Sequence, residues 1–310
     1  MTYSSFTSIE QEIKEMIESN LERTGLLYRI YSRIKSNDSI SEKIKRKGYA
    51  ENEKQIQDFI GIRVMTYFGE DIEILINYFS SIFDIIDLEQ DKMDMKSFSP
   101  VRINLVCRMH GKQLKEFEAR KSYYSEELNN VDSTFEIQIR TTLSEGWHEI
   151  EHNMRYKCKS EWNSLEDESM VLNGIHATLV TSDHTISKLF EEIAYQHYKA
   201  RNWTAMLRNK FRLRFDASPL SPAIASLFDE DKELAKCFYK IKRNKFIYEI
   251  ISHNLYADIS FDNVIYLANY LYVKNEEIFK ITPIPLQRLF DETFTSKADT
   301  SLSNTAYAMK

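Results

Sequence analysis

The sequence predicts an α+β protein, in which a mixed β-sheet flanked by helices is followed by an all-helical C-terminal region. Short β-forming runs recur in the first half of the chain, at 57–67, 84–89, 101–109 and 134–140, and are interspersed with helical patterns. From about residue 164 the apolar residues recur at helical spacing only. We therefore expect a sheet domain at residues 1–200, a helical region at 201–294 and a disordered tail at 295–310.

Composition and charge exclude several classes of protein. The chain has 310 residues, of which 43% are hydrophobic and 28% charged, as is ordinary for a globular protein. Its net charge of -6 argues against a protein that coats nucleic acid through bulk charge. The N-terminus has no basic start followed by an apolar run, and no stretch is apolar enough to cross a bilayer. We expect a cytoplasmic protein without membrane contact.

Cysteines and glycines form none of the familiar ligand-binding motifs. The three cysteines are isolated and not at metal-ligand spacing, which favours buried thiols in a reducing compartment over a zinc site. The seven glycines form neither G-x-G nor G-x-x-x-x-G-K, the loops whose backbone amides hold phosphate. If this protein binds nucleotides, side chains must hold the phosphates.

The chain begins with helical patterns. Apolar residues at helical spacing predict a helix within 7–24, closed by Gly25. The pattern resumes over 26–35, with apolar residues on one face and arginines on another. Asn37 then begins a break that caps the next helix.

The strongest positive cluster of this acidic chain lies in the same region. It comprises Arg29, Arg33, Lys35, Lys43, Lys45, Arg46 and Lys47. Such a run of charges is more often a solvated helix face than a binding site. The alternative is a site for a triphosphate, because arginine offers stacking and bidentate contacts while lysine offers a point charge to the same anion. Ser39 lies on the same side of its helix as Lys43 and Lys47.

The β-forming run at 57–67 is expected at the centre of the sheet, and a helix at 72–83 follows it. Asp58 lies at the mouth of this strand. Gly61 inside it indicates either a close approach by another group or a β-bulge. In so apolar a run Arg63 needs a buried partner, which is either a bound ligand or a structural ion pair.

Two further strands are predicted at 84–89 and 101–109, separated by a polar loop. The segment 110–132 is rich in Lys, Glu, Tyr and Asn and is predicted to be a loop or a mobile helix over the sheet. One or two long helices then extend to about residue 201, and several short helices follow between 222 and 290.

The strand predicted at 134–140 has one apolar and one polar face. Glu136, Gln138 and Arg140 alternate with apolar residues, so an acid, an amide and a guanidinium share one face. A strand that ends in reactive groups and leads into a helix is where a mixed sheet usually has its site. This polar face is therefore the first candidate for function.

A helix is predicted at 143–157, directly after that strand. Thr141 or Thr142 can cap it, with Glu145 at capping-box distance from Thr142. Helical spacing places His148, His152 and then Arg155 or Tyr156 on one side. This side of the helix carries further candidate site residues.

Asp58 and Glu136, two carboxylates on separate strands, suit a magnesium ion that bridges substrate phosphates. Arg63 and Arg140 could neutralise phosphate charge, Gln138 could position a sugar hydroxyl, and Glu136 could serve as metal ligand, base or both. Acidic residues at strand ends are common, so this pairing alone does not decide the chemistry.

Four blocks follow one another between about residues 25 and 160. They are Arg33-x-Lys35 with Ser39 and Lys43, then Asp58-x-x-Gly61-x-Arg63, then Glu136-Ile137-Gln138-Ile139-Arg140-Thr141, then Trp147-x-Glu149-x-Glu151-His152 with Tyr156-Lys157. In this order they resemble the synthetase domain of RelA/SpoT-type alarmone synthetases, especially the small single-domain ones. The chain after residue 200 contributes nothing to the resemblance.

The resemblance implies a nucleotidyltransferase-like mixed sheet that moves a pyrophosphate from ATP to the ribose 3'-hydroxyl of GDP or GTP. It implies that Asp58 and Glu136 handle magnesium and activate the hydroxyl, with Gln138 beside the acceptor. His152 and Lys157 match motif positions that we assign to the acceptor side, and packing at the strand–helix corner is the alternative for His152. The side chains expected to hold ATP are Arg29, Arg33, Lys35, Ser39, Lys43, Lys47, Arg63 and Arg140.

The acceptor loop departs from the family pattern. In the family a tyrosine within G-Y-[RQ]-S-x-H stacks on guanine, whereas here the stretch is Ser97-Phe98-Ser99-Pro100-Val101-Arg102-Ile103-Asn104-Leu105. It lacks both that tyrosine and that histidine. We expect Phe98 to stack on a base and Arg102 to contact phosphate in their place.

Three functions therefore stay open. The first is alarmone synthesis of the stringent-response kind, without a hydrolase, because no hydrolase motif is present. The second is a toxin or defence enzyme with tRNA as acceptor and partner, which the altered loop and the basic residues between 201 and 245 support. The third is an inactive nucleotide-sensing or partner-binding module. The helical region 201–294 is also a candidate surface for a protein partner or self-association.

Overall fold

The computed structural model describes residues 3–47, 55–90, 103–124, 128–253, 255 and 257–294. The predictions made for Phe98, Arg102 and the tail 295–310 lie outside these residues, as does the side chain of Lys47. Within the described ranges, no helix combines the length and the apolar character needed to span a membrane. The chain divides into two compact units, Met1–Ser19 with Tyr28–Ser187 and Asn20–Leu27 with Lys188–Lys310.

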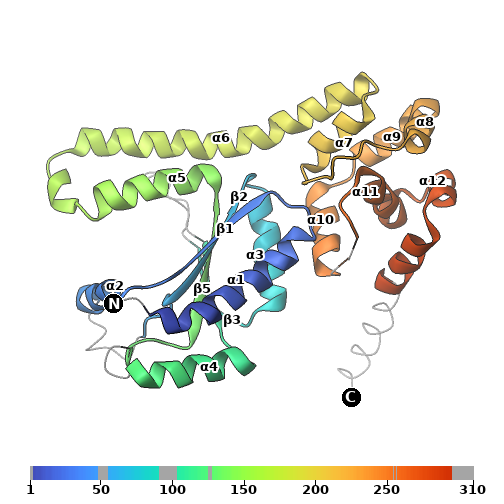
Figure 1. The fold of residues 1–310 in the computed structure, drawn as a ribbon. Helices are drawn as coiled ribbons and strands as arrows, with labels where there is room; N and C mark the ends of the chain where they lie inside the picture. The colour runs from blue at the N-terminus through green and yellow to red at the C-terminus, as the bar shows by residue number, and fades with distance from the viewer. Residues whose placement is uncertain are drawn as a thin grey trace, which may run out of the picture. The chain divides into compact units, whose positions relative to one another are not determined.

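The first unit is built on a mixed sheet, which confirms the predicted α+β class (Figure 1). In the described part of the chain, the strands of this sheet lie in the order β1-β2-β5-β4-β3. Strands β2 and β5 pair in parallel, and the other neighbouring strands pair antiparallel. The four predicted strands are all present as β2 to β5. The strands are β1 (Tyr28–Ile34), β2 (Ile60–Thr66), β3 (Ile85–Gln90), β4 (Ile103–Arg108) and β5 (Thr134–Thr141).

The helical prediction for residues 26–35 is wrong, because most of this segment is strand β1. It pairs with β2 without interruption from Tyr28 opposite Thr66 to Ile34 opposite Ile60. Seven residues with isoleucines four apart fit a helical period as well as an alternating one. Backbone hydrogen bonds to a strand from a later part of the chain decide between the two periods.

Helices flank the sheet in the first unit. They are α1 (Thr7–Glu22), α2 (Asn37–Lys47), α3 (Asp71–Ile82), α4 (Gly111–Lys121), α5 (Thr142–Glu151) and α6 (Glu166–Lys199), of which α1 and α6 continue into the second unit. The segment predicted to be a loop or a mobile helix thus contains α4. Beside the sheet, the buried rings of Phe6, Phe59 and Phe117 pack edge to face, with centroids 5.0 to 5.9 Å apart. Each such pair contributes about 1 kcal/mol beyond the area it buries.

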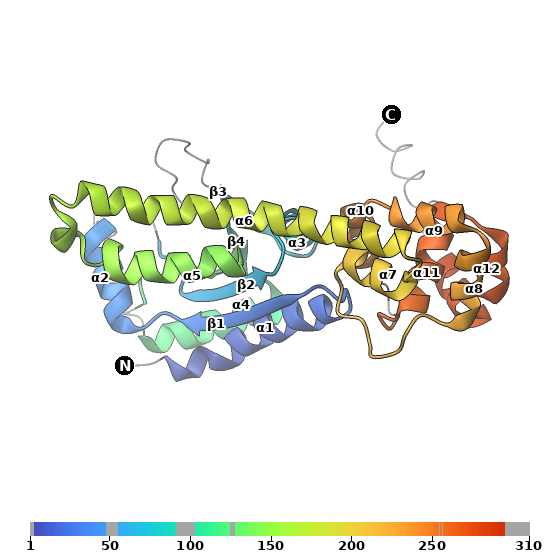
Figure 2. The same cartoon turned by 90° about the horizontal axis from the view of Figure 1, so that it is seen from above.

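Helix α5 and the first part of α6 run side by side (Figures 1 and 2). A π-helical turn at His152–Tyr156 and a 3-10 helix at Lys159–Trp162 join them. The indole Nε1 of Trp147 donates a hydrogen bond to the carbonyl of Leu172 at 3.1 Å, and the ring of His176 packs on the same indole. These contacts fix the position of α5, which carries several of the candidate site residues.

The regular elements among the described residues of the second unit are all helices, as predicted. Beside the end of α6 it contains α7 (Trp203–Phe211), α8 (Pro222–Glu230), α9 (Lys232–Tyr239), α10 (Arg243–Ser252), α11 (Phe261–Ala268) and α12 (Glu276–Ile281). Gly25 belongs to this unit and has φ 67°, and a Cβ there would lie 2.9 Å from Cγ2 of Ile259, so this position requires glycine. Its carbonyl accepts a hydrogen bond from the backbone of Arg214 at 2.6 Å.

Candidate functional site

A cleft of about 430 Å³ lies over the polar face of the sheet in the first unit. A second cavity of about 360 Å³ shares Arg33, Lys35 and Lys43 with it and adds Ser39. The structure thus brings together most of the residues predicted for the site. Those that line the cleft are Arg33, Lys35, Lys43, Asp58, Arg63, Glu136, Gln138, Arg140, His152 and Lys157. Arg29 lines neither cavity, and its guanidinium interacts with Tyr31 and Tyr67.

Strand register explains why residues from distant segments meet on this face. Gly61 of β2 stands opposite Arg33 of β1 on one side and Glu136 of β5 on the other. One step along the strands, Arg63 stands opposite Gln138, which in turn faces Asn104 of β4. Because side chains alternate along a strand, these rows share one face.

Gly61 lies within a regular ladder. The register runs through Gly61 without a shift, so the β-bulge that its sequence context also suggested is absent. A Cβ there would meet the side chain of Arg33 at 3.9 Å, which is an ordinary contact. The absence of a side chain leaves the floor of the cleft open between Arg33 and Glu136.

Asp58 is the anionic centre at one end of the cleft. Its carboxylate accepts a hydrogen bond from Nζ of Lys43 at 2.8 Å and forms a second ion pair with Lys35. The backbone N–H of Lys35 also donates to the carbonyl of Phe59 at 2.8 Å, which holds the two segments together. Burial raises the pKa of Asp58, but the two lysines outweigh burial and lower it to about 2. Asp58 is therefore ionised at any physiological pH.

Glu136 lies at the middle of the sheet, and only 9% of it is exposed. Burial raises the pKa of its carboxyl group, and the charge of Asp58 acts in the same direction. Nε2 of Gln138 donates a hydrogen bond to Oε1 of Glu136 at 2.5 Å, and this bond acts in the opposite direction by lowering the pKa of Glu136. A buried carboxyl group with a raised pKa is a suitable proton acceptor near neutral pH.

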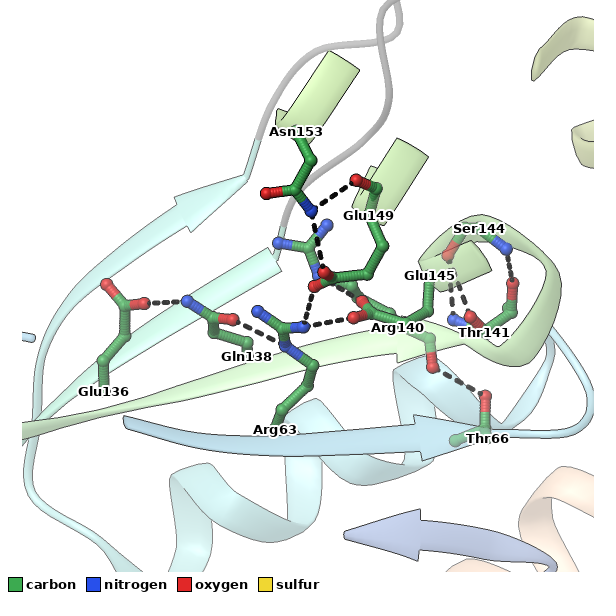
Figure 3. Close-up of polar contacts among 10 residues, drawn as sticks. All are labelled: Arg63, Thr66, Glu136, Gln138, Arg140, Thr141, Ser144, Glu145, Glu149 and Asn153. Carbon is green, nitrogen blue, oxygen red and sulfur yellow. Dashed lines mark hydrogen bonds and ion pairs between the residues drawn. The ribbon is translucent and has the colours of Figure 1, made fainter. Parts of the chain in front are cut away.

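Arg63 sits at the centre of a hydrogen-bonded network (Figure 3). Its Nε donates to Oε1 of Gln138 at 3.0 Å, and its NH1 donates to Oε1 of Glu149 at 2.6 Å and also to Glu145. Arg140 is 5% exposed and lies with its Nε 3.3 Å from Oε2 of Glu145. The sequence suggested either a bound ligand or a structural ion pair for Arg63, and the structure contains the ion pair.

The two ends of the cleft hold different charged groups. At the first end Lys35 and Lys43 pair with Asp58, and Arg33 lines the same cavities. In the network, the two guanidinium groups face the two carboxylates of α5. Three cations are thus gathered at the end formed by β1 and α2, and a polyphosphate is attracted to such cations.

The start of α5 is capped by Thr141 and not by Thr142. Oγ1 of Thr141 accepts a hydrogen bond from the backbone of Ser144 at 3.0 Å, and the backbone of Thr141 donates to Oγ of Ser144 at 3.1 Å. Because Ser144 completes this capping box, Glu145 has no role in it. Glu145 instead pairs with Arg63.

Three rings lie in succession along α5 and the turn that follows it. The rings of His148 and His152 have centroids 5.9 Å apart, and His152 and Tyr156 are 5.5 Å apart at an interplanar angle of 15°. Burial, followed by the charges of Arg140 and Arg63, lowers the pKa of His148 to about 3, and burial also lowers the pKa of His152. These histidines present neutral rings to the cleft.

Asn104 and Glu149 line the cleft and Glu145 pairs with Arg63, but none of them was singled out as a site residue from the sequence. The two glutamates are four residues apart, and this helical spacing could have indicated that they share one side of the helix that follows Arg140. The position of Asn104 depends on the pairing of β4 with β5, for which the sequence holds no local signal.

Comparison with protein families matches residues 32–161 to the family described as "Region found in RelA / SpoT proteins". This stretch includes the whole sheet apart from the first residues of β1, and it includes the residues that line the cleft. No curated protein sequence matches the chain.

Among solved structures, the fold matches small alarmone synthetase 1 from Bacillus subtilis with a TM-score of 0.45 and 23% identity, over 62% of this chain and 97% of that one. It matches small alarmone synthetase 2 from Bacillus subtilis with a TM-score of 0.46 and 21% identity, over 62% and 95%. A GTP pyrophosphokinase family protein from Streptococcus pneumoniae matches with a TM-score of 0.45 and 19% identity, over 60% of this chain and 88% of that one. These values are too low for the likeness to indicate an activity.

Proposed function

Because residues 32–161 form a RelA/SpoT-type region, we propose that this protein transfers a pyrophosphate group from ATP to the ribose 3'-hydroxyl of a guanine nucleotide, GDP or GTP. One observation carries the proposal. The cleft unites a cluster of cations, an ionised aspartate and a buried glutamate, which come from segments far apart in the sequence. Phosphoryl-type transfer requires charge neutralisation, positioning and a group that accepts the hydroxyl proton.

The donor nucleotide is assigned to the cationic end of the cleft. Arg33, Lys35 and Lys43 line both cavities there, and Ser39 lines the second. Asp58 holds the ammonium groups of both lysines inside the cleft, where the phosphates of ATP would meet them. Lysines that are already positioned lose less side-chain entropy on binding than free ones do.

In the proposed reaction Glu136 accepts the proton of the acceptor's 3'-hydroxyl. The 3'-oxygen then forms a bond to the β-phosphorus of ATP, the bond between that phosphorus and the oxygen bridging to the α-phosphorus breaks, and AMP leaves with this oxygen. The buried position of Glu136 supports this role, because its raised pKa favours taking up a proton. Gln138 lies beside Glu136 and shares its face of β5.

The residues present also fit a magnesium ion. Among the described residues no group of three or more His, Cys, Asp or Glu side chains is arranged to hold a metal by itself. Magnesium is commonly held by one or two carboxylates together with substrate phosphates, so Asp58 and Glu136 would hold an ion that arrives with ATP. When bound, such an ion neutralises charge on the phosphates.

The acceptor is assigned to the ring stack and Lys157, of which His152, Tyr156 and Lys157 line both cavities beside the donor residues. His152 lies in the middle of the stack and exposes a neutral ring on which a base can pack. Lys157 donates a hydrogen bond to Oδ1 of Asn153 at 3.1 Å and also lines the cleft. We propose these two residues as contacts of the acceptor nucleotide.

The proposal is tested by incubating the protein with γ-labelled ATP, magnesium and either GDP or GTP, with other nucleotides and tRNA in parallel reactions. We expect label in a 3'-pyrophosphorylated guanine nucleotide. If only tRNA becomes labelled, tRNA takes the place of GDP or GTP as the proposed acceptor. If no acceptor becomes labelled, the proposed enzymatic activity is refuted.

Two variants complete this experiment. Glu136→Gln should lower the rate by orders of magnitude, because it removes both the proton acceptor and a proposed metal ligand. Glu116→Gln removes a carboxylate of α4 that pairs with Arg120 at 2.7 Å outside the cleft, and it should leave the rate unchanged. Equal rates for the two variants would contradict the assignment of Glu136.

A further inference from the structure

One part of the cleft lies beyond Glu136, on the side away from β1. It is formed by Glu89 of β3 and by Asn104 and Val106 of β4, which line the large cleft but not the second cavity, where Ser39 lies. In the sheet, β5 lies between β4 and the strands β2 and β1. The cleft therefore has a wall over β4 that is separate from the donor end.

The direction of the proposed transfer brings the acceptor to this wall. In phosphoryl-type transfer the attacking and leaving oxygens lie roughly in line. Because ATP is assigned to the end formed by β1 and α2, the acceptor's ribose approaches Glu136 from the other side, over β4. There Val106 stands opposite Glu136, and Asn104 stands opposite Gln138. Of these two β4 residues, only Asn104 has a side chain that can form a hydrogen bond with a ribose.

The amide oxygen of Asn104 is a hydrogen-bond acceptor that lacks a donor. Its Oδ1 is buried, and no donor among the described residues reaches it. The amide of Gln138 is already used at both ends, because its Nε2 donates to Glu136 at 2.5 Å and its Oε1 accepts from Arg63 at 3.0 Å (Figure 3). Buried amide oxygens nearly always have a partner in proteins. The terminal torsion of asparagine is broad, so Oδ1 can turn toward a ligand in the cleft.

A ribose offers two neighbouring hydroxyl groups, and two acceptors on this face match them. Asn104 and Glu136 are diagonal neighbours across the β4–β5 pair. Diagonal neighbours lie about 7–8 Å apart, which leaves room for a pair of hydroxyl groups between the ends of the two side chains. When the 3'-hydroxyl donates to Glu136, the adjacent 2'-hydroxyl can donate to Oδ1 of Asn104.

We propose that Asn104 selects a ribonucleotide as acceptor by accepting a hydrogen bond from its 2'-hydroxyl. This inference rests on the proposed function, in which Glu136 takes the proton of the 3'-hydroxyl. A 2'-deoxyribose has no group to pair with Oδ1 and leaves it without a donor. The inference concerns the sugar, and the base is left to the ring stack.

The first test compares GTP with 2'-deoxy-GTP as acceptors, since both carry the 3'-hydroxyl. For the wild-type protein, kcat/KM should be about tenfold to a hundredfold higher with GTP, because the analogue leaves a buried acceptor unpaired. Asn104→Leu keeps the approximate size of the side chain without its polar atoms, and here the two values should agree within about twofold. Equal use of both acceptors by the wild type, or an undiminished preference in Asn104→Leu, would overturn the proposal.

A second comparison separates the sugar from the base. Inosine triphosphate lacks the 2-amino group of guanine but keeps both ribose hydroxyls. The ratio of kcat/KM for GTP to that for inosine triphosphate should be the same in the wild type and in Asn104→Leu. If Asn104→Leu removes a preference for GTP over inosine triphosphate and retains the preference for the 2'-hydroxyl, Asn104 contacts the base and the proposal is wrong.

The third test does not depend on turnover. Calorimetry gives the Kd of GDP and of 2'-deoxy-GDP in the presence of a non-hydrolysable ATP analogue. The wild type should bind GDP at least about tenfold more tightly than 2'-deoxy-GDP, and Asn104→Leu should bind both equally. The Kd of the analogue itself should stay within about twofold in Asn104→Leu, which shows that the donor end of the variant is folded.

Asn244→Leu is the matched control. It removes a second asparagine whose Oδ1 is buried and has no partner among the described residues, but this one lies on α10 in the second unit. It should leave every ratio at the wild-type value. A loss of the 2'-hydroxyl preference in Asn244→Leu as well would mean that the effect is not specific to the cleft.

These outcomes distinguish the inference from the proposed function. If no nucleotide is pyrophosphorylated but GDP binds more tightly than 2'-deoxy-GDP only while Asn104 is present, the activity fails and the assignment of Asn104 stands. If GTP is pyrophosphorylated and Asn104→Leu leaves the preference unchanged, the inference fails and the function stands. If only tRNA is labelled, tRNA with a 2'-deoxy terminal nucleotide replaces 2'-deoxy-GTP, and a preference that Asn104→Leu does not reduce overturns the inference. If nothing binds or reacts, both fail.

Discussion

Neutralising Asp58 should destabilise the first unit by an amount that depends on pH. The pKa of Asp58 falls from 3.8 to about 2 on folding, because Lys35 and Lys43 favour its ionised form against the effect of burial. At about 1.4 kcal/mol per pKa unit, the ionised carboxylate contributes about 2 kcal/mol at neutral pH. Since the folded pKa is the lower one, this contribution is complete above the unfolded pKa and is lost as pH falls through the folded pKa. About half should remain at pH 3.

The measurement compares urea unfolding of Asp58→Asn with the parent protein at pH 7, 5, 4 and 3. Trp147 and Trp162 belong to the first unit and Trp203 to the second, so Trp203→Phe in both proteins lets tryptophan fluorescence report on the first unit. The difference in unfolding free energy should be largest at pH 7 and should narrow below pH 4. Asp84→Asn, a half-exposed aspartate that pairs with Arg108 and His110, should cost at most about 0.5 kcal/mol. A difference for Asp58→Asn that is absent at pH 7, or constant down to pH 3, would refute the reasoning.

Three further predictions concern single residues. Burial and two neighbouring arginines lower the pKa of His148 to about 3, so its ring carbon signals in NMR should not titrate between pH 5 and 8, and a titration midpoint near 6.5 would contradict this. Thr141→Ala removes both the cap of α5 and a hydrogen bond to Asp183 at 2.6 Å. It should lower the free energy of unfolding, measured by urea titration, by about 1–2 kcal/mol. A loss below about 0.5 kcal/mol would mean that the cap is dispensable. Burial, with the charge of Asp84, raises the pKa of Cys107 to about 12, so this thiol should react with a disulfide reagent only after unfolding, and labelling of Cys107 in the folded protein would argue otherwise.

Local patterns were sufficient to predict most of the fold. The strands β2 and β5 have dense β-forming residues and end at polar groups, and each was predicted within a few residues of its bounds. The segment that becomes β1 failed, because its seven residues satisfy both periods and its strand partner lies farther along the chain. The order β1-β2-β5-β4-β3 likewise depends on pairings between distant segments.

The candidate site was predictable in its members but not in its contacts. Alternation along β5 correctly placed Glu136, Gln138 and Arg140 on one face. The ion-pair partners of Arg63 come from α5, and the two lysines that bind Asp58 come from the end of β1 and from α2. These contacts arise from packing between elements, so no sequence spacing encodes them. The prediction that Asp58 and Glu136 hold magnesium stays a prediction.

The parallel pairing of β2 with β5 has a consequence for how the protein folds. Arg63 and Gln138, which stand opposite each other in this pair, are 75 residues apart in the chain. Closing so long a segment costs entropy before any contact repays it, and sheets joined over such distances form slowly. A chain emerging from the ribosome carries Asp58 and its two lysines long before β5 is synthesised. Nucleotide binding in the cleft should therefore appear only once this late pairing has formed, and the rate at which binding is regained during refolding should report the closure of the sheet.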